Sequence, residues 1–327
     1  DPSPDPSPDA RRDAALAVEA AALGVKGVSQ VSTAGASHTR RTIQMAATNG
    51  FSAGYQRSDS ALYGVAIAGE GTGMERDSDG DSRVFRADLR TAQDIGRSAA
   101  ERAVALLDAR KPKTGAFPVR YDERIASSLI GHLLAAANGG AIARGASWLR
   151  DSIDQPVLPD SLDLIEDPHR ARVPGSRAFD AEGLPTARRF IVKHGTLCGV
   201  TLDLATARQL GSVSTANATR GTTSPPSPGT WNVALTQGDK TKDDLMSDLG
   251  TGLLVSSMIG ATINPNTGDY SRGASGFWIE NGEIAYPVNE CTIAGSLPEM
   301  LRAIIPANDA RAHLSRVVPS HLVEGMP

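Results

Sequence analysis

Four consecutive hydrogen-bonding side chains, Asp269, Tyr270, Ser271 and Arg272, are the residues whose types and spacing best support binding chemistry in this chain. Glycines at positions 268, 273 and 276 surround them. Because glycine has no side chain, the backbone at such positions can approach a ligand or another backbone closely. One interpretation is a well-turned β-hairpin in which Asp269 and Arg272 pair with each other. The other is that the four residues form the floor of a site for an extended peptide or for the edge of a partner protein, and on this interpretation they are the binding candidates.

Potential nucleophiles are present, but the sequence gives them no partners. His194 and Cys198 are four residues apart, yet the intervening Gly195 indicates a turn rather than a Cys–His dyad. Ser214–Thr215 and Ser224 lie near His194 only in the sequence, so no serine triad can be argued from them. The sequence therefore predicts no catalytic nucleophile.

Metal and nucleotide sites have equally little support. Asp167 with His169, and Asp180 with Glu182, have a spacing that could serve a metal, but on loops such residues mostly form local turns and salt bridges. Neither a phosphate-binding loop nor a dinucleotide-binding glycine motif is present in the required context. We predict no bound metal and no cofactor.

The segment after the four residues has the pattern of a β-hairpin. Phe277–Ile279 is an apolar run of strand-forming residues, and Asn281-Gly282 is a strong signal for a two-residue turn. Residues 284–288 then alternate, with Ile284, Tyr286 and Val288 on one side, as expected of a strand with one buried face.

The first third of the chain predicts a helix packed on an antiparallel sheet. Asp9 is a candidate N-cap for an alanine-rich helix over residues 10–25, and Thr91 caps a second helix over 92–109. Lys111–Gly115 ends that helix and marks a domain boundary, giving domains 1–112 and 113–327. Strands are expected at 28–33, 41–47, 51–55 and 62–68.

The second domain is predicted to be rich in β structure around a central helix at 122–137. A short strand precedes this helix at 117–121, a long loop occupies 212–230, and a short helix is expected at 242–249. The whole chain is therefore predicted to be α+β, with a barrel- or sandwich-like second domain. Further strands are expected at 189–192, 199–202, 231–237 and 252–263.

Composition excludes several classes of protein. The 33 basic and 37 acidic residues give a net charge of −4, and aromatic residues are only 4%, so we expect no nucleic-acid surface. No apolar run reaches the roughly 18 residues that a membrane span needs, so no membrane partner is expected. The two cysteines, Cys198 and Cys291, are expected to be reduced.

Several motifs in the same order resemble the TldD/PmbA family, and in particular its PmbA (TldE) branch. These motifs cover most of the chain from about residue 10 onward. The resemblance implies a cytoplasmic protein, with a further N-terminal segment ahead of Asp1. The motifs are SLIGHLLAAANGGAIARGASWL at 128–149, SRAFDAEGLPT at 176–186, ARQLGSVSTANATRG at 207–221 and TGDYSRGASGFWIENGEIAYPV at 267–288.

The resemblance also identifies what this chain lacks. TldD-branch members are zinc peptidases with an HExxxH helix and a distant cysteine ligand, in which the glutamate is the base toward the bound water. His132 matches the first histidine, but Leu133 stands at the position of the base and Ala137 at that of the second histidine. The region after Asn308 contains no cysteine. His132 is then a degenerate former metal position, and the chain is expected to be inactive alone.

Three functions remain open at this point. The resemblance favours a non-catalytic TldE/PmbA-like subunit that joins a TldD-like zinc peptidase, which degrades unfolded peptides or matures ribosomally made ones. The second is a stand-alone homodimer that binds a peptide or protein without proteolysis. The third is an active enzyme with a different mechanism. The older family description, modulator of DNA gyrase, finds no DNA-binding signature in this sequence.

Overall fold

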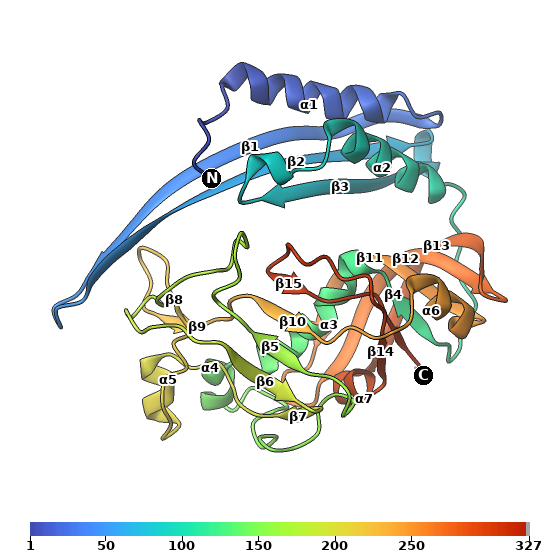
Figure 1. Cartoon of the computed structure of the whole chain (residues 1–327). Helices are drawn as coiled ribbons and strands as arrows, with labels where there is room; N and C mark the ends of the chain where they lie inside the picture. The colour runs from blue at the N-terminus through green and yellow to red at the C-terminus, as the bar shows by residue number, and fades with distance from the viewer. Residues whose placement is uncertain (325–327) are drawn as a thin grey trace. The chain divides into compact units, whose positions relative to one another are not determined.

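The computed structural model describes residues 1–324 and has an α+β architecture (Figure 1). The chain divides into two compact units, the first formed by Asp1–Ala109 with Arg172–Pro174 and the second by the remaining residues. The predicted fold class is confirmed, with a helix and antiparallel sheet first and a sheet-rich part after them. The strand orders of the sheets in residues 1–324 are open, so these sheets do not close into a barrel.

The first unit is a three-stranded antiparallel sheet with two helices on one face (Figure 1). Small side chains let the helices and the sheet approach closely, since the shared core consists of alanines at 22, 66, 68, 99, 100 and 103. A side chain at Gly96 would collide with the Val18 carbonyl oxygen of the facing helix. The elements are α1 (Pro8–Leu23), β1 (Val28–Ala46), β2 (Ser52–Ala68), η1 (Gly71–Gly73), β3 (Glu75–Arg83), η2 (Arg86–Asp88) and α2 (Ala92–Ala105).

Three local predictions in this unit are corrected. The N-cap of α1 is Ser7, which accepts the Ala10 N–H at 3.1 Å, with Pro8 as the first helical residue. β1 and β2 are each one continuous strand, paired from Val28↔Ala68 to Ala46↔Ser52, because the long ladder runs through the expected turn. β3 was not predicted because its sequence is strongly polar.

Buried carboxylates of β3 pair with arginines of β3 itself and of other segments. Asp79 pairs with Arg90 at 2.8 Å and with Arg102 at 3.2 Å. Asp81 accepts from Arg83 Nε at 2.9 Å. Buried carboxylates need such partners, since an unpaired buried charge is costly. The ion pairs explain why an acidic strand can join this sheet.

The second unit contains a six-stranded sheet, a five-stranded sheet and a small two-stranded ladder. The strand order of the larger sheet is β13-β12-β11-β4-β16-β14, and that of the smaller is β15-β10-β5-β6-β7. The strands of the larger sheet are β4 (Val119–Tyr121), β11 (Gly252–Ile263), β12 (Asp269–Glu280), β13 (Glu283–Ser296), β14 (Ile304–Pro306) and β16 (His321–Val323). The others are β5 (Leu164–Glu166), β6 (Arg189–Lys193), β7 (Thr196–Leu197), β8 (Ala218–Thr219), β9 (Ser227–Pro228), β10 (Val233–Leu235) and β15 (Arg316–Val317).

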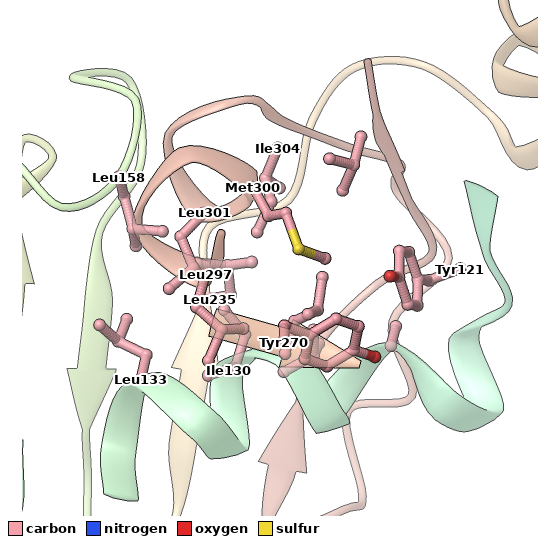
Figure 2. Packing of buried hydrophobic residues seen from close by; sticks show 14 of the residues in the cluster. Tyr121, Ile130, Leu133, Leu158, Leu235, Tyr270, Leu297, Met300, Leu301 and Ile304 are labelled. Carbon is pink, nitrogen blue, oxygen red and sulfur yellow. The ribbon is translucent and has the colours of Figure 1, made fainter. Parts of the chain in front are cut away.

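The central helix α3 (Glu123–Ala136) supplies the middle of the core. Figure 2 shows Ile130 and Leu133 of this helix facing Leu297 and Leu301 of α7, with Tyr270 nearby. Fully burying a leucine or isoleucine contributes roughly 1.5–3 kcal/mol, so this cluster fixes the helix firmly. The other helices are α4 (Gly139–Ala143), α5 (Leu204–Gln209), α6 (Lys242–Leu249) and α7 (Leu297–Arg302).

The predicted hairpin is confirmed as β12 and β13, whereas Ile284, expected on the buried face, is 56% exposed. Asn281 and Gly282 both have positive φ, 54° and 78°, as a two-residue turn of the primed type requires. Trp278 pairs with Tyr286 across the hairpin.

The long segment 212–230 is attached to the smaller sheet through a buried acid. Glu166 of β5 accepts from the Trp231 N–H at 2.7 Å and from Asn217 Nδ2 at 3.0 Å. Arg189 donates to the same carboxylate at 2.8 Å. The ends of the segment are therefore fixed by charge-assisted hydrogen bonds.

Candidate functional site

A half-buried part of α3 carries the polar residues of the candidate site. The helix begins at the N-cap Asp122, whose carboxylate accepts the Arg124 N–H at 3.1 Å. Ser128, Gly131 and His132 are half-buried, and the Ser128 Oγ and His132 Nε2 atoms are themselves buried. A Cβ at Gly131 would lie 3.1 Å from the Arg316 guanidinium, so the absence of a side chain leaves room for this cation beside the helix.

His132 contacts an aromatic ring and lies near a cation. Its ring meets Tyr270 edge-on, with centroids 5.7 Å apart and an interplanar angle of 70°. Its Nε2 atom is buried and has no hydrogen-bond partner among the described residues. Burial, and then the positive charge of Arg272, lower the pKa of His132. The imidazole is therefore neutral near pH 7.

Two buried tyrosines, Tyr270 and Tyr121, belong to the core against which α3 packs. Tyr270 is 2% exposed, and its hydroxyl donates to Met258 Sδ at 3.4 Å. Burial raises the pKa of Tyr270, and burial together with the neighbouring Tyr270 phenol raises the pKa of Tyr121 well above its usual value. Both phenols stay protonated at neutral pH, so neither is an anionic ligand.

Arg272 is held by an irregularity in the neighbouring strand. The pairing of β11 with β12 shifts between Ile259 and Thr262, where Gly260 has a φ of 63°. Arg272 Nε donates to the Gly260 carbonyl at 2.6 Å. This bond orients the guanidinium, whose charge acts on His132 and on both phenols.

The four residues singled out from the sequence lie on both faces of β12. Successive strand residues point to opposite sides, so Tyr270 and Arg272 share the face that meets α3, whereas Asp269 and Ser271 point away. Asp269 is exposed and accepts from Thr267 Oγ1 at 2.6 Å rather than pairing with Arg272. The structure thus brings together His132, Tyr270 and Arg272.

The surroundings of His132 do not fit a zinc ion. Leu133 and Ala137, the positions at which the sequence resemblance implies a base and a second histidine, are both 0% exposed and belong to the apolar core. Arg272 is the charged residue that acts on His132, and its positive charge disfavours a metal cation at the same place. Within residues 1–324, no group of three or more His, Cys, Asp or Glu side chains could hold a metal.

His194 and Cys198 have separate partners in a turn. His194 and Gly195 have positive φ, 47° and 71°, between β6 and β7. The Cys198 thiol donates to the Thr196 carbonyl at 3.4 Å, whereas His194 Nδ1 lies 3.9 Å from Asp163.

The two pairs with metal-compatible spacing bind backbone N–H groups. Asp180 accepts those of Glu182 and Leu184, both at 2.9 Å, and Asp167 accepts that of His169 at 2.9 Å, which are contacts of turns. Asp180 also accepts the N–H of the distant Ala218 at 3.1 Å.

Sequence reasoning missed Tyr121 and His321. Their rings stack at 5.3 Å, and His321 is completely buried. Burial lowers the pKa of His321 to about 4. Tyr121 and His321 meet because β4 pairs with β16, and no local pattern in the sequence signals this distant pairing.

The comparison with known families assigns both units. Residues 1–107 match the PmbA/TldA metallopeptidase central domain, and residues 114–327 match the C-terminal domain of that family. The chain belongs to the PmbA/TldA metallopeptidase family. The resemblance found in the sequence motifs is thereby confirmed.

Relatives with curated descriptions extend beyond this chain. It is 38% identical to the metalloprotease PmbA of Escherichia coli O157:H7 over 79% of its length and 55% of that protein. It is 39% identical to a PmbA homologue of Haemophilus influenzae over 68% of its length and 48% of that protein. The chain thus spans about half the length of the curated relatives it matches.

Solved structures share the fold over the whole chain. A protein of Bacteroides thetaiotaomicron, described as a candidate modulator of DNA gyrase, has a TM-score of 0.90 and 28% identity, covering 100% of this chain and 75% of that one. TldE of Thermococcus kodakarensis, with a TM-score of 0.86 and 20% identity, covers 100% of this chain and 76% of that one, and it supports the fold alone. No described helix is long and apolar enough to cross a membrane.

Proposed function

We propose that this chain is a non-catalytic, TldE/PmbA-like subunit of a cytoplasmic TldD/TldE-type metallopeptidase that acts on unfolded or ribosomally made peptides. The proposal rests on the residues in and around α3 that surround His132. His132 is retained there, but Leu133 and Ala137 are committed to the core and Arg272 brings a positive charge. The relatives named metalloproteases support the family framework, and the missing ligands support a partner role.

In this proposal the chain helps to bind the peptide, and a zinc-bearing sister chain supplies hydrolysis. Arg272 lines the peptide path beside α3, where its guanidinium, oriented by Gly260, can pair with a substrate carboxylate or carbonyl. Tyr270 is buried and supports this region from the core. Asp269 and Ser271, on the opposite face of β12, are proposed to contact the partner. The neutral His132 ring supports Tyr270 and carries out no proton transfer.

Co-expression tests this assignment. The chain is expressed with an HExxxH-bearing TldD-like chain of its own genome, and the purified products are assayed for association and for casein digestion. We expect a stable heterodimer whose hydrolysis is abolished by chelation and by replacing the sister's HExxxH glutamate. Chelator-sensitive cleavage by this chain alone would overturn the proposal. A homodimer that ignores the sister and still binds peptide would establish the stand-alone binding protein instead.

A further inference from the structure

A strand edge without a partner lies at one end of the six-stranded sheet, outside the His132 cluster. β13 is the last strand of that sheet. Its first half is covered where the Arg110 N–H donates to the Pro287 carbonyl at 3.1 Å. For residues 291–296, the only backbone partner seen in the described part of the chain is β12. An uncovered edge of this kind is a template for an added strand.

A cavity of about 670 Å³ opens beside this edge. One wall is the segment Lys111–Phe117, here called the strap, and the opposite wall is formed by Trp278, Cys291 and Ile293. Phe117 anchors the strap by an edge-on contact with Trp278, with ring centroids 4.8 Å apart. The volume lies within the range of pockets that bind small ligands or single large side chains.

The edge and the cavity match the two requirements of peptide recognition by strand addition. In that mode the backbone pairs with a sheet edge, while alternate side chains enter pockets. Cys291 and Ile293 are two residues apart, so they lie on the same face of β13, and both line the cavity. A strand added along 291–296 would direct every second side chain toward the same face.

The charges at the cavity favour one kind of peptide. Lys111 and Lys113 contribute two ammonium groups, whereas Glu290 contributes one carboxylate. The Lys111–Glu290 pair, at 3.1 Å, and the Lys113–Glu280 pair, at 3.7 Å, are both largely exposed and therefore weak, so they can rearrange when a ligand binds. Either ammonium group can then pair with an acidic residue next to the inserted side chain.

We propose that residues 291–296 of β13 and the strap cavity form a binding site for an extended peptide that carries a large apolar side chain flanked by an acidic residue. The site takes one such side chain and holds the backbone through the strand edge. This inference rests on the proposed function in taking a peptide as the ligand. Binding by this chain alone is measured without the sister chain, so either idea can fail while the other stands.

Fluorescence anisotropy of a labelled peptide tests the site directly. The probe is a fluorescein-labelled decapeptide of alternating valine and threonine with a central Phe-Glu pair. Ala116→Trp, which fills the cavity from the exposed strap, should weaken binding at least tenfold. Ala285→Trp is the matched control. Ala285 is an exposed residue of β13 outside the cavity lining, so this variant should leave binding unchanged. Absence of binding to the unaltered chain, or equal binding to both variants, would overturn the proposal.

Modified probes separate backbone pairing from filling of the cavity. N-methylation of alternate residues on one edge of the peptide blocks strand pairing, whereas methylation of the other edge does not. One of the two methylated probes should lose at least tenfold in affinity, and the other should bind as the unmodified probe does. Equal affinities would mean that the β13 edge takes no part, which contradicts the proposal. A probe with lysine in place of glutamate should bind several-fold more weakly at low salt.

Thiol protection locates the bound peptide. Cys291 lines the cavity, whereas Cys198 is exposed and does not line it, so Cys198 is an internal control. Saturating probe should slow alkylation of Cys291 by N-ethylmaleimide severalfold and leave Cys198 unaffected. Equal rates at Cys291 with and without bound probe would place the peptide elsewhere and overturn the assignment.

Discussion

The role of His132 is determined by its neighbours rather than by its residue type. In a zinc peptidase of this family the same position is expected to hold a metal. Here the ring packs against Tyr270, and burial together with Arg272 lowers its pKa. A histidine kept neutral in this way can support a neighbouring ring but has no charge to contribute.

The positive charge of Arg272 should have a measurable effect on the pKa of His132. Arg272→Ala removes one of the two causes that lower the pKa of His132, so that pKa should rise, and Arg272→Lys should largely retain the lowered value. Titration of the His132 ring protons by NMR measures the change. An unaltered titration in Arg272→Ala would show that the guanidinium does not act on the ring.

Arg272 should also matter to the assembled peptidase. Arg272→Ala is expected to reduce peptide hydrolysis by the complex, with association of the subunits retained. The rate of casein digestion at equal amounts of complex measures this effect. Full activity would limit Arg272 to its hydrogen bond with the Gly260 carbonyl.

His321 should make the stability depend on pH. Its pKa is about 4 in the folded chain against 6.5 unperturbed, so between these values the unfolded chain binds a proton that the folded chain does not. The free energy of unfolding should therefore fall as the pH decreases from 6.5 to about 4, by on the order of 3 kcal/mol.

Urea unfolding at several pH values measures this contribution. His321→Phe, which keeps a ring beside Tyr121, should flatten the dependence, whereas the exposed His194→Ala should not. The same slope in His321→Phe as in the unaltered chain would show that another group is responsible.

At the scale of elements, the sequence predicted those helices and turns that are determined by residues close together in the chain. The Asn281-Gly282 hairpin, the helix α6 and the cap of α2 by Thr91 all depend on neighbouring residues, and the structure has them as expected. The continuity of β1 could not be predicted, because its pairing with β2 overrides the expected turn.

The site was predictable only in part, for the same reason. His132 was identified through the family motif, and Tyr270 and Arg272 through their glycine-rich surroundings. Their meeting with Tyr121 requires the parallel pairing of β4 with β11, which joins residues far apart in the sequence. No period or turn signal carries that information.

Close strand packing at Gly276 should tolerate no side chain. A Cβ there would collide with the Leu254 carbonyl oxygen of β11, so Gly276→Ala should lower the free energy of unfolding by roughly 1–3 kcal/mol. Gly73→Ala, in open space at negative φ, is the matched control. Urea unfolding followed by tryptophan fluorescence compares the two, and equal stability would contradict the packing described for β11 and β12.

Introducing the HExxxH motif into α3 should not create a zinc site, because residues 133 and 137 are buried in the core. Leu133→Glu with Ala137→His places two polar groups in the apolar core, which should cost several kcal/mol without building a metal site. Thermal unfolding and zinc competition with a colorimetric chelator measure both effects. Tight binding of one zinc by a stable variant would show that only the side chains, and not the helix orientation, had changed.

At the scale of the whole molecule, both units match a metallopeptidase family, whereas the surroundings of His132 do not fit zinc. The family match covers both units, and the fold agrees with solved relatives over the full chain. The hairpin and α3 pack on a common core, to which Leu133 and Ala137 also belong. This combination is the basis of our proposal that the chain binds peptides without hydrolysing them.

Zinc stoichiometry tests this central claim most directly. The purified chain is equilibrated with zinc, desalted and analysed by inductively coupled plasma mass spectrometry, beside the His132→Ala variant. The account predicts far less than one zinc per chain, with no difference between the two proteins. One zinc per chain, lost in His132→Ala, would contradict it.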